Sequence, residues 1–86
     1  MTDIRDKAKT LLEEYELCRK ARPRGDVIEV QIEKDACLEW AAHLYQGLEW
    51  GSHDSDLEYT YNELETRMKK LRECIVIEVL RNGIYH

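Results

Sequence analysis

The sequence predicts a mainly α-helical protein of three helices, with one short strand between the first and the second helix (order α-β-α-α). Apolar residues recur at alternating spacings of three and four along most of the chain, which is typical of packed helices. Gly and Pro are few, and only one short stretch alternates apolar and polar residues. The second and third helices are expected to form an antiparallel hairpin, and residues 1–86 to form a single domain.

The first helix is expected over residues 3–22. Its apolar stripe steps by four and three residues, at Ile4, Ala8, Leu11, Tyr15 and Cys18. Thr2 can cap its N-terminus, and Pro23 ends it because proline disfavours the α conformation in the preceding residue. Basic residues cluster at its end, at Arg19, Lys20, Arg22 and Arg24. They complement the helix dipole or, alternatively, form a patch for phosphate or an acidic partner.

A half-buried strand is expected over residues 27–33, because Ile28, Val30 and Ile32 alternate with polar residues and are β-branched. A lone strand leaves backbone groups unpaired, so it needs a partner. The candidates are the same strand of a second copy around a two-fold axis, residues 74–80 of this chain, or a strand edge of a binding partner. We favour the second copy, because no Gly or Pro near the later segment supports a change from helix to strand.

The second helix is expected over residues 35–50, with Gly51 ending it. Its apolar stripe consists of Cys37, Ala41, Leu44 and Leu48. Gly47 falls within its last turns, where glycine costs up to about 1 kcal/mol relative to alanine. A short loop then leads into the third helix.

The third and longest helix is expected over residues 55–83, with a capping box at Ser55 and Glu58 and a stop at Asn82-Gly83. Its stripe repeats about every 3.5 residues, at Leu57, Tyr61, Leu64, Met68, Leu71 and Ile75. Beyond Leu71 the stripe broadens, so we expect this half to contact a second chain. The expected self-association residues are Ile28, Val30, Ile32, Ile75, Val76 and Val79. Because so short a chain buries a small core, we expect a homodimer.

Charge is distributed unevenly around a net of −5: residues 1–25 carry +2, residues 26–66 carry −10 and residues 67–86 carry +3. The acidic block spans adjacent elements, whose solvent faces are expected to merge into one surface. Its partner-binding members are Glu29, Glu33, Asp35, Glu39, Glu49, Asp54, Asp56, Glu58 and Glu63. Exposed aromatic residues beside these acids, at Tyr45, Trp50 or Tyr59, would favour a binding role because aromatic residues are enriched at interface hot spots.

Sequence signals for chemistry are weak. Ser52-His53-Asp54 have the residue types of a hydrolytic triad, but triads assemble in space rather than from neighbours in sequence. Cys18, Cys37 and Cys74 lack the paired spacing of zinc sites, and we interpret them as buried reduced thiols. The glycines are isolated, so they form no phosphate-binding loop. We therefore predict no enzymatic activity, no catalytic residues, no metal and no cofactor.

The sequence thus predicts a non-enzymatic protein-interaction module. In its sharper form, this is an inhibitor or adaptor that acts as a nucleic-acid mimic, its acidic surface engaging a basic, nucleic-acid-binding protein; an anti-defence inhibitor is one example. The alternatives are a structural or regulatory homo-oligomer, or a nucleic-acid-associated protein using the basic helix ends, which the acidic centre disfavours. With no long apolar run and no hydrophobic leader in the sequence, we expect a cytoplasmic protein without membrane contact.

Overall fold

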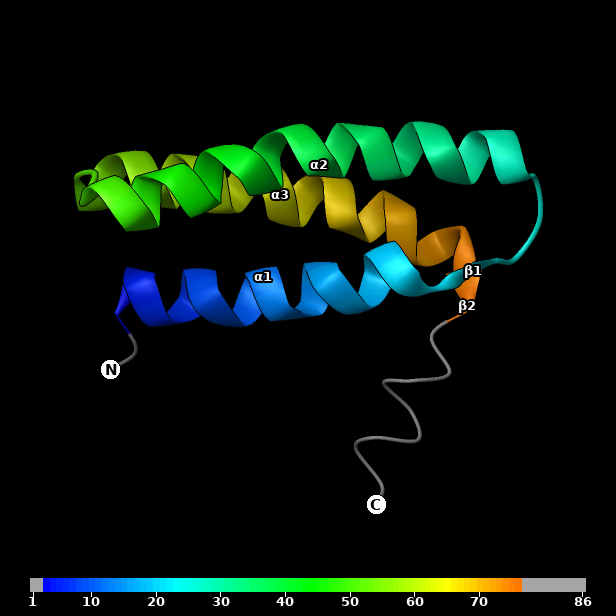
Figure 1. The fold of residues 1–86 in the computed structure, drawn as a ribbon, viewed down its shortest axis with the longest axis horizontal. Helices are drawn as coiled ribbons and strands as arrows, with labels where there is room; N and C mark the ends of the chain where they lie inside the picture. Colours follow the sequence, from blue (N-terminus) through cyan, green and yellow to red (C-terminus); the bar gives the residue numbers. More distant parts are fainter. Residues whose placement is uncertain (1–2, 77–86) are drawn as a thin grey trace, which may run out of the picture.

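Helices dominate the structure, a computed structural model that describes residues 3–76 (Figure 1). Within that range the order is α1 (Ile4–Lys20), β1 (Arg22–Pro23), α2 (Val27–Trp50), α3 (Asp54–Glu73) and β2 (Ile75–Val76). Helices α2 and α3 run antiparallel and share the most extensive contact, and α1 packs against both. The predicted mainly α class, the α-β-α-α order and the helical hairpin are therefore confirmed.

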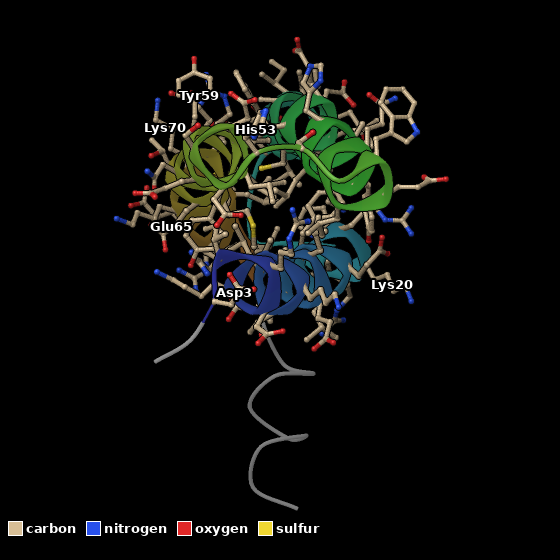
Figure 2. The ribbon with its side chains drawn as sticks, turned by 90° about the vertical axis from the view of Figure 1, so that its left-hand side faces the viewer. Asp3, Lys20, His53, Tyr59, Glu65 and Lys70 are labelled. Atoms are coloured by element: carbon tan, nitrogen blue, oxygen red, sulfur yellow. The ribbon has the colours of Figure 1, made fainter. Side chains whose placement is uncertain are left out.

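All of these helices contribute to one apolar core. Its buried members are Ala8, Leu11, Leu12, Tyr15, Cys18, Val30, Cys37, Ala41, Leu44, Leu57, Leu64, Met68, Leu71 and Ile75. The end-on view shows the helices enclosing this core, with side chains such as Lys20, Tyr59 and Lys70 pointing outward (Figure 2). The stripe predicted for the first helix is confirmed, as is that of the third helix from Leu57 to Leu71, with Ile4 and Tyr61 half-buried at the edges of the core. Ile75, the last member predicted for the third helix, is buried but belongs to β2.

Residues 27–33 form the first turns of α2, so the predicted strand at this position is wrong. The Asp26 carboxylate accepts a hydrogen bond from the backbone N–H of Ile28 at 2.9 Å and caps the helix. Val30 is 2% exposed in the core, whereas Ile28 and Ile32 are 71% and 61% exposed. Residues two apart share a face in a strand but lie about 200° apart around a helix, which explains this separation. The expected pairing of this segment with the same strand of a second copy is therefore also wrong.

Lys34 interrupts the apolar stripe of α2, so the sequence pattern does not show that the helix begins before this residue. The spacing of Cys37, Ala41 and Leu44 extends back to Val30 only through position 34, where a polar residue occurs. The Lys34 side chain is half-buried, and its ammonium donates a hydrogen bond to the backbone carbonyl of Ala21 at 3.1 Å. The charged end of Lys34 thus satisfies the carbonyl of Ala21, the C-cap residue of α1.

A two-residue strand, β1, does lie between α1 and α2. It pairs antiparallel with β2, with Arg22 opposite Val76 and Pro23 opposite Ile75. The backbone N–H of Arg24 extends this pairing by donating to the carbonyl of Cys74 at 2.8 Å. The sequence offers residues 74–80 as one candidate partner for a strand at residues 27–33. Within that segment Ile75 and Val76 are extended, but they pair with β1 instead.

Helix α3 ends at Glu73, so the predicted continuation of this helix through Val76 is wrong. Ile75 and Val76 are β-branched, and their extended conformation buries Ile75 completely while pairing with β1. The remainder of that predicted helix, including Val79 and the stop at Asn82-Gly83, lies outside the described residues, as does the predicted cap Thr2.

The turn between α2 and α3 depends on glycine at its start. Gly51 ends α2 as predicted, in the left-handed conformation with φ 72° and ψ 39°. Gly47 is buried, and a Cβ atom there would lie 2.8 Å from Leu57 Cδ2, so glycine permits the close approach of α3. The predicted capping box is wrong: α3 begins at Asp54, one residue early, and its N-cap His53 makes no side-chain capping bond.

A pair of alanine substitutions distinguishes a helix from a strand at residues 27–33. Val30→Ala should lower the free energy of unfolding by about 1–2 kcal/mol, because it removes buried methyl groups. Ile32→Ala, the matched control, should change it by less than about 0.5 kcal/mol, because this side chain is exposed. Urea unfolding followed by circular dichroism measures both variants. Equal losses for the two variants would contradict the helical assignment.

Candidate functional site

The acidic residues predicted to bind a partner all remain at the surface. Glu33 and Glu63 are half-buried. The exposed members are Glu29, Asp35, Glu39, Glu49, Asp54, Asp56 and Glu58. Each carboxylate therefore has access to solvent, as a partner-binding surface requires.

These acids do not all share one face. Asp54 lies 3.9 Å from the guanidinium of Arg5, which belongs to α1. Asp35 lines a hollow together with Tyr15 and Arg19, also from α1. Asp56, by contrast, lines a hollow built by α2, α3 and the turn between them. The structure thus divides the expected acidic surface between the α1 side and the line along which α2 meets α3, which we call the α2–α3 seam.

Near the open end of the hairpin, Glu29 extends the acidic character of the seam. Its carboxylate lies 3.8 Å from the Cys74 sulfur, just beyond the end of α3. Glu33 lies one turn further along α2, and its charge also acts on Cys74. Glu63 is an acidic residue of the seam that belongs to α3, and it forms an ion pair with Arg67.

Trp40 is the centre of an aromatic group on the α2–α3 seam. Its ring meets His43 edge-on at 5.6 Å and Tyr59 edge-on at 5.8 Å between centroids. The guanidinium of Arg67 lies over the same ring, 5.1 Å from its centroid, while also binding the Glu63 carboxylate. A tryptophan and a carboxylate thus hold one guanidinium between α2 and α3.

The three aromatic residues expected beside the acids are all exposed. Tyr45 is 45% exposed, Tyr59 60% and Trp50 74%. Tyr45 belongs to the α1 side, because its hydroxyl donates to Glu16 at 3.4 Å. Tyr59 and Trp50 lie along the seam, and Trp40 completes this set. No sequence pattern identifies Trp40 as a member of this group, because its contacts with α3 depend on tertiary packing.

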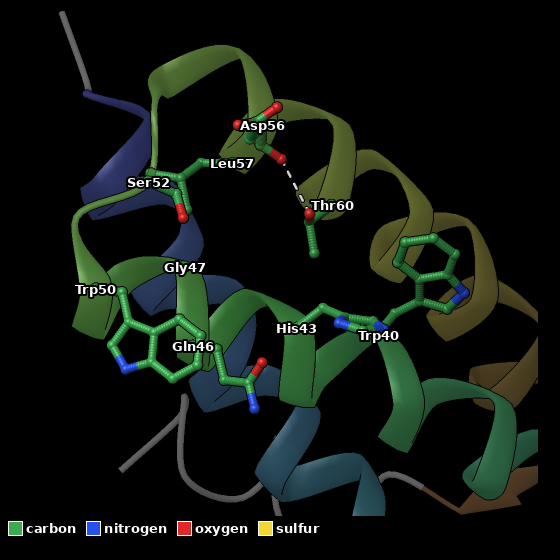
Figure 3. A pocket seen from close by; sticks show the side chains of 9 residues that line it. All are labelled: Trp40, His43, Gln46, Gly47, Trp50, Ser52, Asp56, Leu57 and Thr60. Carbon is green, nitrogen blue, oxygen red and sulfur yellow. Dashed lines mark hydrogen bonds between the residues drawn. The ribbon is translucent and has the colours of Figure 1, made fainter.

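A hollow of about 340 Å³ opens in the seam beside the turn (Figure 3). Its lining residues are Trp40, His43, Gln46, Gly47, Trp50, Ser52, Asp56, Leu57 and Thr60. The rings of Trp50 and Trp40 lie at opposite ends of the view, and Asp56 lies on the α3 side. The lining combines flat aromatic surface with hydrogen-bond acceptors and one carboxylate, which suits recognition of a polar or cationic group.

The residues of the turn have structural contacts. The carbonyl of Ser52 accepts a hydrogen bond from the Arg5 guanidinium at 2.9 Å. The carbonyl of His53 accepts backbone N–H bonds from the first turn of α3. Together with the contact between Arg5 and Asp54, these bonds join the start of α1 to the hairpin turn.

The cysteines are free thiols in different environments. Cys18 and Cys37 are buried as predicted, and burial raises the pKa of both thiols, that of Cys37 to about 11. Cys74 is only half-buried. Across residues 3–76, no group of three His, Cys, Asp or Glu side chains could hold a metal ion. Over the same residues, no helix has the length and apolar character needed to cross a membrane.

The expected self-association residues separate in the structure. Val30 and Ile75 are buried in the chain's own core, so they are not available to a second copy. Val76 is half-buried in β2, and Val79 lies outside the described residues. Ile28 and Ile32 remain exposed at the start of α2, beside Val27, which is 65% exposed.

Comparison with protein-family models, curated proteins and solved structures found no match to this chain. The fold and surface define a class in physical terms: a small helical protein with exposed aromatic and acidic residues along one helix–helix seam.

Removing the charge of Glu29 should shift the alkylation of Cys74 toward lower pH. Partial burial and the Glu29 carboxylate both raise the pKa of the Cys74 thiol, because they disfavour the thiolate. Glu29→Gln should lower that pKa and increase the reactive thiolate fraction at a given alkaline pH. Mass spectrometry of iodoacetamide labelling between about pH 7 and pH 10 measures the profile. Glu39→Gln serves as the control, and an unchanged profile in Glu29→Gln would contradict the contact.

Proposed function

We propose that this chain is a non-enzymatic protein-interaction module that binds a basic protein through the α2–α3 seam, as an inhibitor or adaptor. The observation that carries the proposal is the joint exposure of Trp50 and Tyr59 on a seam that also holds Asp56 and Glu63. Exposed aromatic side chains beside carboxylates are suited to a partner that presents both apolar and cationic groups.

Charge supports a basic partner. Residues 26–66, which include α2 and most of α3, carry a net charge of −10. Such a field attracts a positively charged protein and accelerates its association. The partner class proposed is a cytoplasmic nucleic-acid-binding protein, whose basic groove the exposed carboxylates would occupy as phosphates do. Blocking that groove would inhibit the partner.

The apolar start of α2 favours a second candidate function, a structural or regulatory homo-oligomer. Val27, Ile28 and Ile32 expose more than half of their surface there, although they are large and apolar. A second copy that covered them would remove this surface from water. Sedimentation at micromolar concentration distinguishes an oligomer from a monomeric binding module.

Charge reversal on the seam tests the proposed function. Glu29→Lys combined with Asp56→Lys should weaken capture of a basic nucleic-acid-binding protein from cell extract by about tenfold, or about 1.4 kcal/mol. Captured protein should be released from the unmodified chain by added double-stranded DNA, which competes for the same groove. Quantitative mass spectrometry of the captured proteins measures both effects.

A matched variant controls for net charge. Glu13→Lys combined with Asp35→Lys makes the same change in charge, but both residues line hollows that α1 shares with α2. This control should retain capture within about twofold, apart from the general loss of attraction. Equal loss in the two double variants would contradict a specific seam, and capture that DNA does not reverse would contradict nucleic-acid mimicry.

A further inference from the structure

We infer that the hollow between α2 and α3 is a binding site for one arginine side chain of the partner. This inference rests on the proposed function and names the group that the seam would recognise. The supporting observation is the environment of Arg67, which this chain holds with a tryptophan and a carboxylate. The hollow is also lined by a tryptophan and a carboxylate.

Arg67 shows how the seam holds a guanidinium. Its guanidinium carbon lies 5.1 Å from the centroid of the Trp40 ring, and its Nη1 atom binds the Glu63 carboxylate. The aromatic ring comes from α2 and the carboxylate from α3, so the cation bridges the two helices. Stacking on an indole and pairing with a carboxylate are the two contacts that a planar guanidinium makes best.

The hollow supplies the same pair of groups closer to the turn. Trp50 comes from α2, ten residues after Trp40, and Asp56 comes from α3, seven residues before Glu63. Because α2 and α3 are antiparallel, Trp50 lies nearer the turn than Trp40 does, and Asp56 lies nearer the turn than Glu63 does (Figure 3). A tryptophan from α2 and a carboxylate from α3 thus line one hollow, and no lysine or arginine is among the described residues that line it.

Both groups are accessible to a ligand. The Trp50 side chain is 74% exposed, which leaves its ring available for stacking. Asp56 is exposed as well, and the hydrogen bond from the Thr60 hydroxyl, at 2.9 Å, goes to its backbone carbonyl rather than to its carboxylate. Gln46 and Ser52 add acceptor oxygens to the same lining.

The size of the hollow fits a single side chain. Its volume of about 340 Å³ is at the lower end of the range for small-ligand sites, roughly 300–1,000 Å³. Arginine should bind better than lysine, because only the guanidinium is planar and can stack while it pairs with a carboxylate. Citrulline has a nearly identical shape but no charge, so it should bind least.

Blocked tripeptides of sequence Gly-Arg-Gly, Gly-Lys-Gly and Gly-citrulline-Gly provide the probes. In ¹H–¹⁵N spectra of the full chain, the arginine peptide should produce saturable shifts of the Trp50 indole N–H, larger than those of the Trp40 indole. The lysine peptide should bind about fivefold more weakly. Shifts from citrulline equal to those from arginine, or no saturable shift from arginine, would overturn the inference.

Three substitutions locate the site. Trp50→Ala and Asp56→Asn should each weaken arginine binding by about tenfold, since each removes one of the two main contacts. Glu13→Gln, an exposed residue of α1 away from the seam and equally a loss of one negative charge, should bind as the unmodified chain does. The affected side chains are exposed, and an unchanged spectrum away from the seam confirms that each variant is folded. Equal weakening by Glu13→Gln would overturn the assignment to Asp56.

The outcome separates this inference from the proposed function. If the arginine peptide fails to bind while charge reversal on the seam still weakens capture of a basic protein, the arginine site is overturned and the proposed function stands. If the peptide binds at Trp50 while no basic protein is captured, the arginine site is supported and the proposed function fails.

Discussion

The capping of α2 by Asp26 is the interaction on which the rest of the structure depends. The hydrogen bond from the Ile28 backbone N–H to its carboxylate starts the helix at Val27, within a stretch whose composition favours a strand. From there α2 continues for 24 residues, or about 36 Å, against a longest molecular dimension of 38 Å. It therefore spans the whole molecule and forms the seam with α3 from Glu29 to Trp50.

Much of the fold could be predicted from the sequence, because α1 and α3 carry regular apolar stripes and Gly51 marks the end of α2. The start of α2 could not be predicted, because position 34 of its stripe holds a lysine. The ammonium of Lys34 donates a hydrogen bond to the carbonyl of Ala21 at the end of α1. The pairing of β1 with β2 could not be predicted from the sequence either. Two-residue strands have no periodic pattern, and their pairing depends on tertiary contacts such as that of Arg24 with Cys74.

The candidate site was predictable only in its composition. Counting charges and aromatic residues predicts exposed acids, and the structure places all nine acids of the predicted partner-binding set at the surface. Which acids lie together depends on how each helix is rotated about its axis, and core packing fixes that rotation: Asp35 faces α1, whereas Asp56 faces the seam. The contact of Trp40 with Arg67 joins residues 27 apart, and no local pattern predicts it.

Helix α2 continues without a break from Val27 to Trp50, so the aromatic and acidic residues of the seam share one continuous surface. Backbone ¹³Cα chemical shifts together with NOEs between Hα(i) and HN(i+3) test this most directly. We expect helical shifts throughout residues 27–50, with NOEs that continue across Lys34. Strand-like shifts over residues 27–33, with helical values beginning only after Lys34, would contradict it.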